Sequence, residues 1–212
     1  MNQISVVGIA GSIRKGSYTK MAVDLALQGS KEAGAKTKLI DLQDYELIFC
    51  DGKEDETNYP EDVFRLRSDV REAQGIILGT PEYHGSFSGI LKNTLDLMGF
   101  DEFEGKMVGV VSVSGGMMGG LEAASSLRNI CRALHSWVIP EQTVIPEAWK
   151  AFGDNGKLKD QALDERIRKV GQQVTRFANL HASENALEFL NSWQCLEENP
   201  GATKKEEVTP KV

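Results

Sequence analysis

The chain has 212 residues, and 24 Lys and Arg against 31 Asp and Glu give it a formal net charge of −7. Hydrophobic residues make up 41% and charged residues 26%, with 21 glycines and 6 prolines, which excludes collagen-like, low-complexity and wholly disordered chains. This composition indicates one globular domain, and the acidic balance without a basic run argues against a nucleic-acid or anionic-membrane surface.

Neither the cysteines nor the N-terminus indicates secretion. Cys50, Cys131 and Cys195 are far apart and form no CxxC or CxxH spacing, which argues against a disulfide framework and a structural zinc site. The first residues, MNQISVVGIAGS, lack a basic stretch followed by a long apolar one, and no window approaches the roughly 18 apolar residues of a membrane span. We therefore expect a cytoplasmic protein with no metal and no membrane partner.

Apolar runs typical of buried strands alternate with segments of helical periodicity. In chain order we expect a strand at Ile4–Ala10, a helix at Tyr18–Ala33, a strand at Lys36–Leu42, an irregular exposed loop at Tyr45–Tyr59, a helix at Glu61–Gln74, a strand at Gly75–Thr80, a helix at Phe87–Met98, a strand at Met107–Val113, a helix at Leu121–Leu134, a strand within Trp137–Ile145 and a helix at Leu163–Leu180. Pro140 and Pro146 make the fifth strand the least regular one.

Strands that alternate with helices at this spacing imply right-handed crossovers. The expected fold is therefore α/β, with a doubly wound five-stranded parallel sheet covered on both faces. We place this domain at residues 1–180 and a helical extension at 181–200, where Leu187, Phe189, Leu190 and Trp193 supply apolar surface. Residues 201–212 are small and charged, which predicts a disordered tail.

The loop after the first strand carries groups that bind a phosphate monoester. Ligands of an open parallel sheet bind beyond the carboxyl ends of its strands. In GSIRKGSYT, Ser12, Ser17 and Thr19 supply hydroxyls and Arg14 a guanidinium beside the start of a helix, where backbone N–H groups favour an anion. The loop matches neither a P-loop nor GxGxxG, so a terminal phosphate fits better than a pyrophosphate. The alternative is that Ser17 and Thr19 only cap a helix.

Two further loops have shapes that admit a flat ring. Thr80 to Ser86 (TPEYHGS) leaves a buried strand with an aromatic ring, an imidazole and a glycine, and Ser114 to Gly120 (SGGMMGG) allows a close backbone approach. Taken alone, His84 is more often structural than catalytic, Glu82 fits a solvated charge, and the glycine loop fits a flexible turn. Together with the phosphate loop they indicate a mononucleotide, and both adenine and flavin mononucleotides satisfy these residues.

Three motifs in this order carry a resemblance to a known family. GSIRKGSYT after the first strand, GTPEYHGSFSGILKNTLD after the third and VSVSGGMMGG after the fourth resemble the NAD(P)H-dependent FMN reductase family, which includes quinone, azo-dye and chromate reductases. The similarity covers about residues 3 to 180. It implies a flavodoxin-like fold with strand order 2-1-3-4-5, and a homodimer or homotetramer with the flavin near a subunit interface.

The same resemblance assigns cofactor-binding residues. It implies that Ser12, Arg14, Ser17 and Thr19 hold the FMN phosphate, with Tyr18 contributing backbone. The ring would be bordered by Pro81, Glu82, Tyr83, His84 and Gly85, and its pyrimidine side by Ser114, Gly115 and Gly116. Many members have asparagine where this chain has His84, which makes His84 a pocket residue more than a catalytic acid.

The activity that follows from the resemblance is hydride transfer from NAD(P)H through bound FMN to a second, planar acceptor. Quinones, azo compounds, metal oxyanions, iron chelates and free flavin all fit that description. No side-chain nucleophile is required, because the flavin supplies the chemistry and the protein supplies orientation. One alternative is a flavodoxin-like electron carrier or redox sensor that does not oxidise NAD(P)H. A second is a nucleotide-binding module without flavin.

Overall fold

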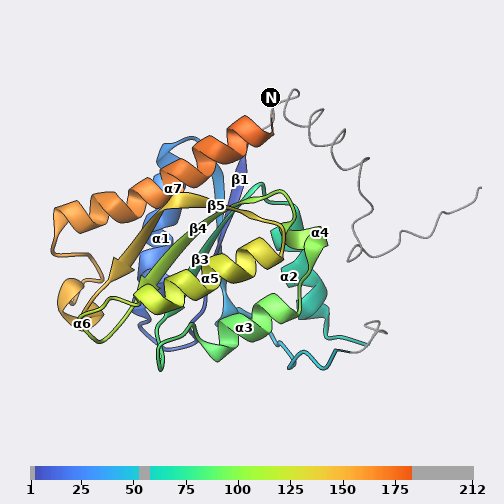
Figure 1. Cartoon of the computed structure of the whole chain (residues 1–212), viewed down its shortest axis with the longest axis horizontal. Coiled ribbons are helices and arrows are strands. Elements are labelled where there is room, and N and C mark those ends of the chain that lie inside the picture. Colours follow the sequence, from blue (N-terminus) through green and yellow to red (C-terminus); the bar gives the residue numbers. More distant parts are fainter. Residues whose placement is uncertain (1–2, 53–57, 183–212) are drawn as a thin grey trace, which may run out of the picture.

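The computed structural model describes residues 3–52 and 58–182, which form one sheet flanked by helices (Figure 1). In chain order the elements are β1 Ser5–Ala10, α1 Tyr18–Glu32, β2 Lys36–Asp41, the 3-10 helix η1 Leu42–Asp44, α2 Glu61–Arg71, β3 Gly75–Pro81, α3 Gly89–Asp96, α4 Phe100–Phe103, β4 Met107–Val113, α5 Leu121–Ala133, β5 Trp137–Ile145, α6 Ala148–Ala151 and α7 Gln161–His181.

The sheet has the order β2-β1-β3-β4-β5, and every neighbouring pair is parallel. This confirms the predicted doubly wound, flavodoxin-like α/β fold. Every residue of β3 and β4 is buried, which explains why both strands are continuous apolar runs. β5 lies at the sheet edge, where Pro140 is tolerated, and its register against β4 shifts between Val108 and Val110.

Helices cover both faces of the sheet, as Figure 1 shows. Helices α1 and α7 pack on one face, where Val23, Val170 and Val174 belong to one buried cluster. Helices α2, α3 and α5 supply a second cluster on the other face, with Leu66 and Leu127 fully buried. Because both faces are covered, only the edges of the sheet and the loops are left for binding.

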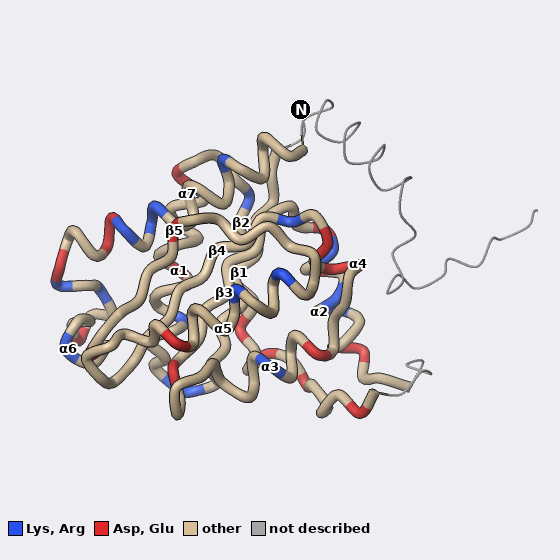
Figure 2. The backbone as a smooth tube through the Cα atoms, in the orientation of Figure 1, with Lys and Arg blue, Asp and Glu red and all other residues tan. Residues whose placement is uncertain are grey.

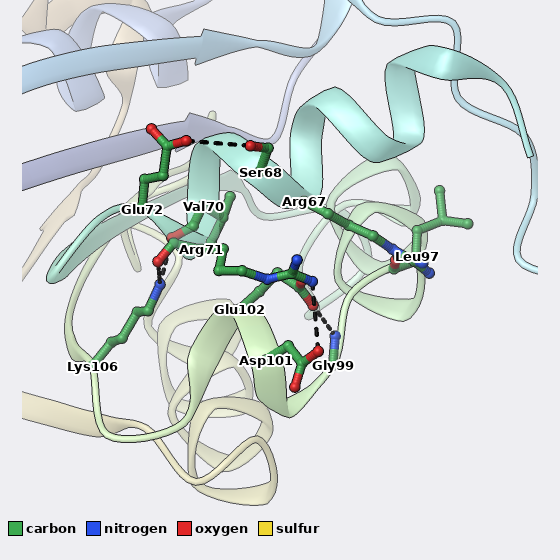
Figure 3. Close-up of polar contacts among 10 residues, drawn as sticks. All are labelled: Arg67, Ser68, Val70, Arg71, Glu72, Leu97, Gly99, Asp101, Glu102 and Lys106. Carbon is green, nitrogen blue, oxygen red and sulfur yellow. Dashed lines mark hydrogen bonds and ion pairs between the residues drawn. The ribbon is translucent and has the colours of Figure 1, made fainter. Parts of the chain in front are cut away.

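A polar cluster holds α2 against α4 at the amino edge of the sheet (Figure 3). The buried Glu102 carboxylate accepts from Arg71 at 2.6 Å and from the N–H of Gly99 at 2.9 Å. Lys106 Nζ donates to the carbonyls of Val70 and Arg71, the last turn of α2, and burial lowers the pKa of Lys106 to about 8. These contacts fix the end of the sheet that lies opposite the loops at its carboxyl edge.

The predicted helices and strands are all present, but several boundaries differ. α2 ends at Arg71 instead of Gln74, and α3 covers only Gly89–Asp96 of the predicted Phe87–Met98. The short helices η1, α4 and α6 are not in the prediction. The prediction of an exposed loop at Tyr45–Tyr59 is wrong at its end, because Tyr59 is buried against Val63 and Leu97.

The other sequence predictions concern the C-terminal segment, the distribution of charge and the membrane. Of the extension predicted for 181–200, only His181, the last residue of α7, and Ala182 are described; the rest of it and the tail predicted for 201–212 lie outside the described residues. Acidic and basic residues are interspersed along the helices instead of gathering on one of them (Figure 2). Among the helices described, none is long and apolar enough to cross a membrane.

Candidate functional site

The three unusual loops come together at the carboxyl edge of the sheet. Strands β1, β3 and β4 are consecutive neighbours in the sheet, so the segments that follow Ala10, Pro81 and Val113 leave the same edge side by side. The register pairs Ala10 with Gly79 and Pro81 with Val113. This is the place where open parallel sheets bind ligands.

The loop after β1 presents backbone N–H groups without acceptors. Ser17 is the N-cap of α1, and its Oγ accepts from the N–H of Lys20 at 3.2 Å. Within the described residues, the N–H groups of positions 15 to 19 donate to no protein acceptor. Five such donors at the start of a 15-residue helix form a preorganised anion site.

The side chains of this loop divide into buried hydroxyls and exposed cations. Ser12, Ser17 and Thr19 are buried, and the Thr19 hydroxyl has no hydrogen-bond partner in the part of the chain that the structure describes. Arg14 and Lys15 are exposed, and neither forms an ion pair with a described residue. The loop therefore carries two uncompensated positive charges next to its unpaired N–H groups in the sequence.

The loop after β3 is a tight turn with a left-handed backbone. Tyr83 and Ser86 exchange both backbone hydrogen bonds, at 2.9 and 3.1 Å. His84 and Gly85 between them have φ values of 53° and 73°, as a type I′ turn requires. Asn, Asp and His are the non-glycine residues most often found at such φ values. The conformation gives a physical reason for asparagine or histidine at position 84.

The Glu82 side chain joins this loop to the next one. Its Oε2 accepts from the N–H of Ala123 at 3.0 Å, in the first turn of α5. The N-cap of α5 is Gly120, which has no side chain to accept that bond. Glu82 therefore caps α5 from another loop, and its negative charge is favourable at the helix N-terminus.

The loop after β4 is held at its base by hydrogen bonds, while its tip is exposed. Ser112 Oγ donates to the carbonyls of Gly119 and Gly120, at 3.2 and 2.8 Å. Ser114 accepts the N–H of Ala148 on its carbonyl and that of Gly116 on its Oγ. Met117 and Met118 at the tip are 82% and 72% exposed. A Cβ at Gly115 would meet nothing within 4 Å and one at Gly116 would meet Ser114 Oγ at 3.7 Å, so this backbone is open to a flat molecule.

Two contacts that tie these loops together could not be predicted from the sequence. Ser88, the N-cap of α3, donates from its Oγ to the carbonyl of Gly11 at 2.6 Å. Tyr18 stacks on Phe152, with ring centroids 5.4 Å apart. Both contacts join residues far apart in the sequence. The only local signal was Ser88 at a helix start, which indicates a cap but not the Gly11 contact.

The two described cysteines, Cys50 and Cys131, lie outside the three loops. Burial raises the pKa of the Cys131 thiol to about 12, so it is protonated at neutral pH and a poor nucleophile. Cys50 is exposed and donates to the carbonyl of Asp96. Residues 3–52 and 58–182 contain no group of three His, Cys, Asp or Glu side chains placed to hold a metal.

The known proteins that this chain resembles use FMN. Residues 4–150 match the family model described as NADPH-dependent FMN reductase. An FMN-dependent NADPH-azoreductase of Staphylococcus saprophyticus is 36% identical over 175 residues, which cover 80% of this chain and 92% of the relative. One from Staphylococcus aureus is 31% identical over 176 residues, 81% of this chain and 93% of the relative.

A solved structure supports the fold independently. FerB, a flavoenzyme NAD(P)H:(acceptor) oxidoreductase from Paracoccus denitrificans, superposes with a TM-score of 0.65 over 84% of this chain and 98% of its own. The two sequences are 20% identical, so this likeness concerns the fold alone.

Proposed function

The chain belongs to the NADPH-dependent FMN reductase family, and from that membership we propose that it uses bound FMN to pass hydride from NAD(P)H to a second, planar small molecule. It is an FMN-dependent oxidoreductase with NADPH as co-substrate. FMN supplies the hydride chemistry when bound, because its N5 accepts and returns a hydride. The acceptor class, whether a quinone, an azo compound, a metal oxyanion, an iron chelate or free flavin, is left open by this site.

The observation that carries the proposal is the donor set of the loop after β1. Five backbone N–H groups without protein acceptors, the buried hydroxyls of Ser12, Ser17 and Thr19 and the exposed Arg14 fit a terminal phosphate. Tyr18 contributes its N–H to that set, and its ring is held by Phe152. The donors suit the phosphate of FMN, and we propose these residues as its site.

The other two loops suit the ring of the same molecule. We propose that the segment Pro81 to Gly85 borders the ring and that Ser114, Gly115 and Gly116 face its pyrimidine side. The N–H of Gly115, which has no acceptor among the described residues, supports this, since N–H donors stabilise negative charge that develops on a bound ring; the N–H of Gly116 already donates to Ser114 Oγ. Glu82 acts here through α5, by holding the loop after β3 against the loop after β4.

The test is the visible spectrum of the purified protein before and after anaerobic addition of NADPH. A yellow protein that bleaches on addition is the expected result. A yellow protein that dithionite bleaches but NADPH and NADH do not would contradict the reductase and favour an electron carrier. A colourless protein that FMN cannot restore would contradict both and favour a nucleotide module without flavin.

The oligomeric state and the location of the protein are two further parts of the proposal. We propose a homodimer or homotetramer, supported by the exposed apolar side chains of Met117, Met118 and Leu121 beside the site. We also propose a cytoplasmic location, supported by the free thiols of Cys50 and Cys131.

Replacing His84 with asparagine is expected to preserve the rate of flavin reduction by NADPH within about tenfold. Asparagine adopts the left-handed backbone at φ 53° and forms hydrogen bonds, but it does not titrate near neutral pH. A general acid would contribute about 10²–10⁴-fold. Stopped-flow reduction of the FMN-saturated variant measures this. A loss above a hundredfold with FMN fully bound would make His84 a proton donor. The control His84→Val puts a β-branched residue at the same φ and should weaken FMN binding.

Double-reciprocal plots of the initial rate against NADPH concentration, at several fixed quinone concentrations, are expected to give parallel lines. The turn at Tyr83 to Ser86 and the loop at Ser114 to Gly120 are short and pinned by backbone bonds, so they offer edges to one planar molecule at a time. Donor and acceptor should then alternate, and each should inhibit competitively against the other at high concentration. Intersecting lines with a detectable complex of enzyme, donor and acceptor would contradict the single site.

A further inference from the structure

A second concave surface lies on the other side of the phosphate loop from β3. It is an open pocket of about 540 Å³ between the N-terminus of α1 and the carboxyl end of β2. Small-molecule sites commonly measure about 300–1,000 Å³, so a ligand the size of a nucleotide fits. The lining residues are Arg14, Lys15, Gly16, Ser17, Lys20, Met21, Asp24, Leu39, Asp41, Gln43 and Asp44.

The charges of this pocket are only partly satisfied by its own residues. Lys20 pairs with Asp41, which also accepts the N–H of Gln43 at 3.2 Å. Lys15 and the carboxylate of Asp44 have neither an ion pair nor a side-chain hydrogen bond within the described residues. Lys15 and the Asp44 carboxylate are therefore open to a ligand, as is Arg14, the second unpaired cation of the lining.

The pocket also has an apolar part. Met21 of α1 and Leu39 of β2 are half-buried and line it together. A surface that combines apolar side chains, a carboxylate acceptor and a cation matches the three parts of a nucleotide. The apolar part suits a base, the carboxylate suits ribose hydroxyls, and the cation suits a phosphate.

We propose that this pocket binds the adenosine half of the reduced nicotinamide dinucleotide, with Lys15 contacting one of its phosphates and Asp44 accepting from a ribose hydroxyl. The inference rests on the proposed function, since the same dinucleotide must present its nicotinamide to the flavin site. Strand β1 separates β2 from β3, and strands lie about 4.8 Å apart, so the ends of β2 and β3 are about 10 Å apart. Two joined mononucleotides cover that separation.

The experiment compares donors with and without an adenosine half. NADPH, NADH and reduced nicotinamide mononucleotide each reduce the FMN-saturated protein, and KM is measured for the unaltered chain and for Lys15→Ala. We expect the KM for NADPH to rise about tenfold in the variant, the effect of one charged hydrogen bond, and that for the mononucleotide to stay unchanged. Lys31→Ala, which removes the same charge from the other end of α1, should change neither.

A second variant blocks the pocket without touching the phosphate loop. Gln43 is exposed at its rim, and only its backbone N–H bonds to Asp41, so Gln43→Trp fills space while keeping that bond. It should raise the KM for NADPH and NADH, and it should leave the affinity for FMN and the KM for the mononucleotide unchanged. A rise confined to NADPH in Lys15→Ala would place its 2′-phosphate at Lys15, and a rise for both dinucleotides would place the pyrophosphate there.

Direct binding separates this inference from the proposed function. Calorimetric titration of the FMN-loaded protein with ADP should show one site that is abolished in Gln43→Trp. In Lys15→Ala the affinity for ADP should fall about tenfold if Lys15 contacts the pyrophosphate, and the affinity for 2′-phospho-ADP-ribose should fall instead if it contacts the 2′-phosphate. Three results would contradict binding of the adenosine half in this pocket. They are absence of ADP binding, an unchanged KM for NADPH in both variants, and an equal rise of the KM for the mononucleotide. If no donor bleaches the flavin, the proposed function fails instead, whatever the ADP titration shows.

Discussion

Arg14→Ala is expected to purify with little flavin while it stays folded. Arg14 is exposed, its guanidinium has no partner within the described chain, and it directly precedes the unpaired N–H groups of positions 15 to 19. Removing a hydrogen-bond partner from a charged group costs about 1.5–3 kcal/mol, which lowers FMN affinity by roughly ten- to over a hundredfold. Calorimetric titration of the apoprotein with FMN measures the loss, and circular dichroism checks the fold.

A control variant and a second ligand test whether a loss of FMN affinity comes from the phosphate contact of Arg14. Arg176→Ala removes an exposed arginine from α7, on the sheet face that α1 and α7 cover, and should bind FMN as the unaltered chain does. Riboflavin, which lacks the phosphate, should bind the unaltered chain much more weakly than FMN. Unchanged FMN affinity in Arg14→Ala, or equal affinities for riboflavin and FMN, would show that the loop after β1 is not the phosphate site.

The difference between Arg14 and Lys15 makes the two proposed sites separable. Both are exposed cations on the same short loop, and both also line the pocket beside β2. If the assignments hold, Arg14→Ala changes the affinity for FMN and Lys15→Ala changes the KM for NADPH. The reverse pattern would exchange their roles, and two variants that lose only FMN would leave the β2 pocket without a cation.

The fold could be predicted from the sequence because its signals are local. Apolar runs such as MVGVVSV and helical periodicities mark the strands and long helices residue by residue, and right-handed crossovers then restrict the topology. Helices α4 and α6 have four residues each, too few for a periodic pattern. Tyr59 was misplaced because its burial depends on Val63 and Leu97, which an acidic neighbourhood does not reveal.

The loops of the site could be predicted, but their mutual arrangement could not. The hydroxyls and glycines are visible in the sequence, and strand order brings their loops to one edge. The bond from Ala123 to Glu82 joins residues 41 positions apart, and that from Ser88 to Gly11 joins residues 77 apart. No sequence pattern encodes such pairs: the family resemblance implies a place for Glu82 beside the ring, and its bond to α5 is visible only in the structure.

Gly171→Ala is expected to lower the free energy of unfolding more than any substitution in the binding loops. Gly171 lies where α7 crosses α1, and a Cβ built there would be 1.7 Å from the carbonyl oxygen of Ala26. Gly29 makes the matching approach on α1, 2.0 Å from the carbonyl of Arg168. Backbone atoms stand on both sides, so the helices must separate and their cluster around Val23 and Val174 must loosen.

The cost should exceed ordinary overpacking, which is about 1–3 kcal/mol, because no side chain can rotate away. Separation would also break the 3.0 Å bond from the Ser30 hydroxyl to the Gly171 carbonyl. At about 2–4 °C per kcal/mol for a chain of this size, a loss of about 3 kcal/mol lowers Tm by about 6–12 °C. Calorimetry of the apoprotein measures this change in Tm, so cofactor binding does not contribute to it.

Gly89→Ala, where a Cβ meets nothing within 4 Å, should not lower Tm. A Tm for Gly171→Ala within 2 °C of the unaltered chain, a margin below about 1 kcal/mol on the same scale, would mean that α1 and α7 do not cross this closely.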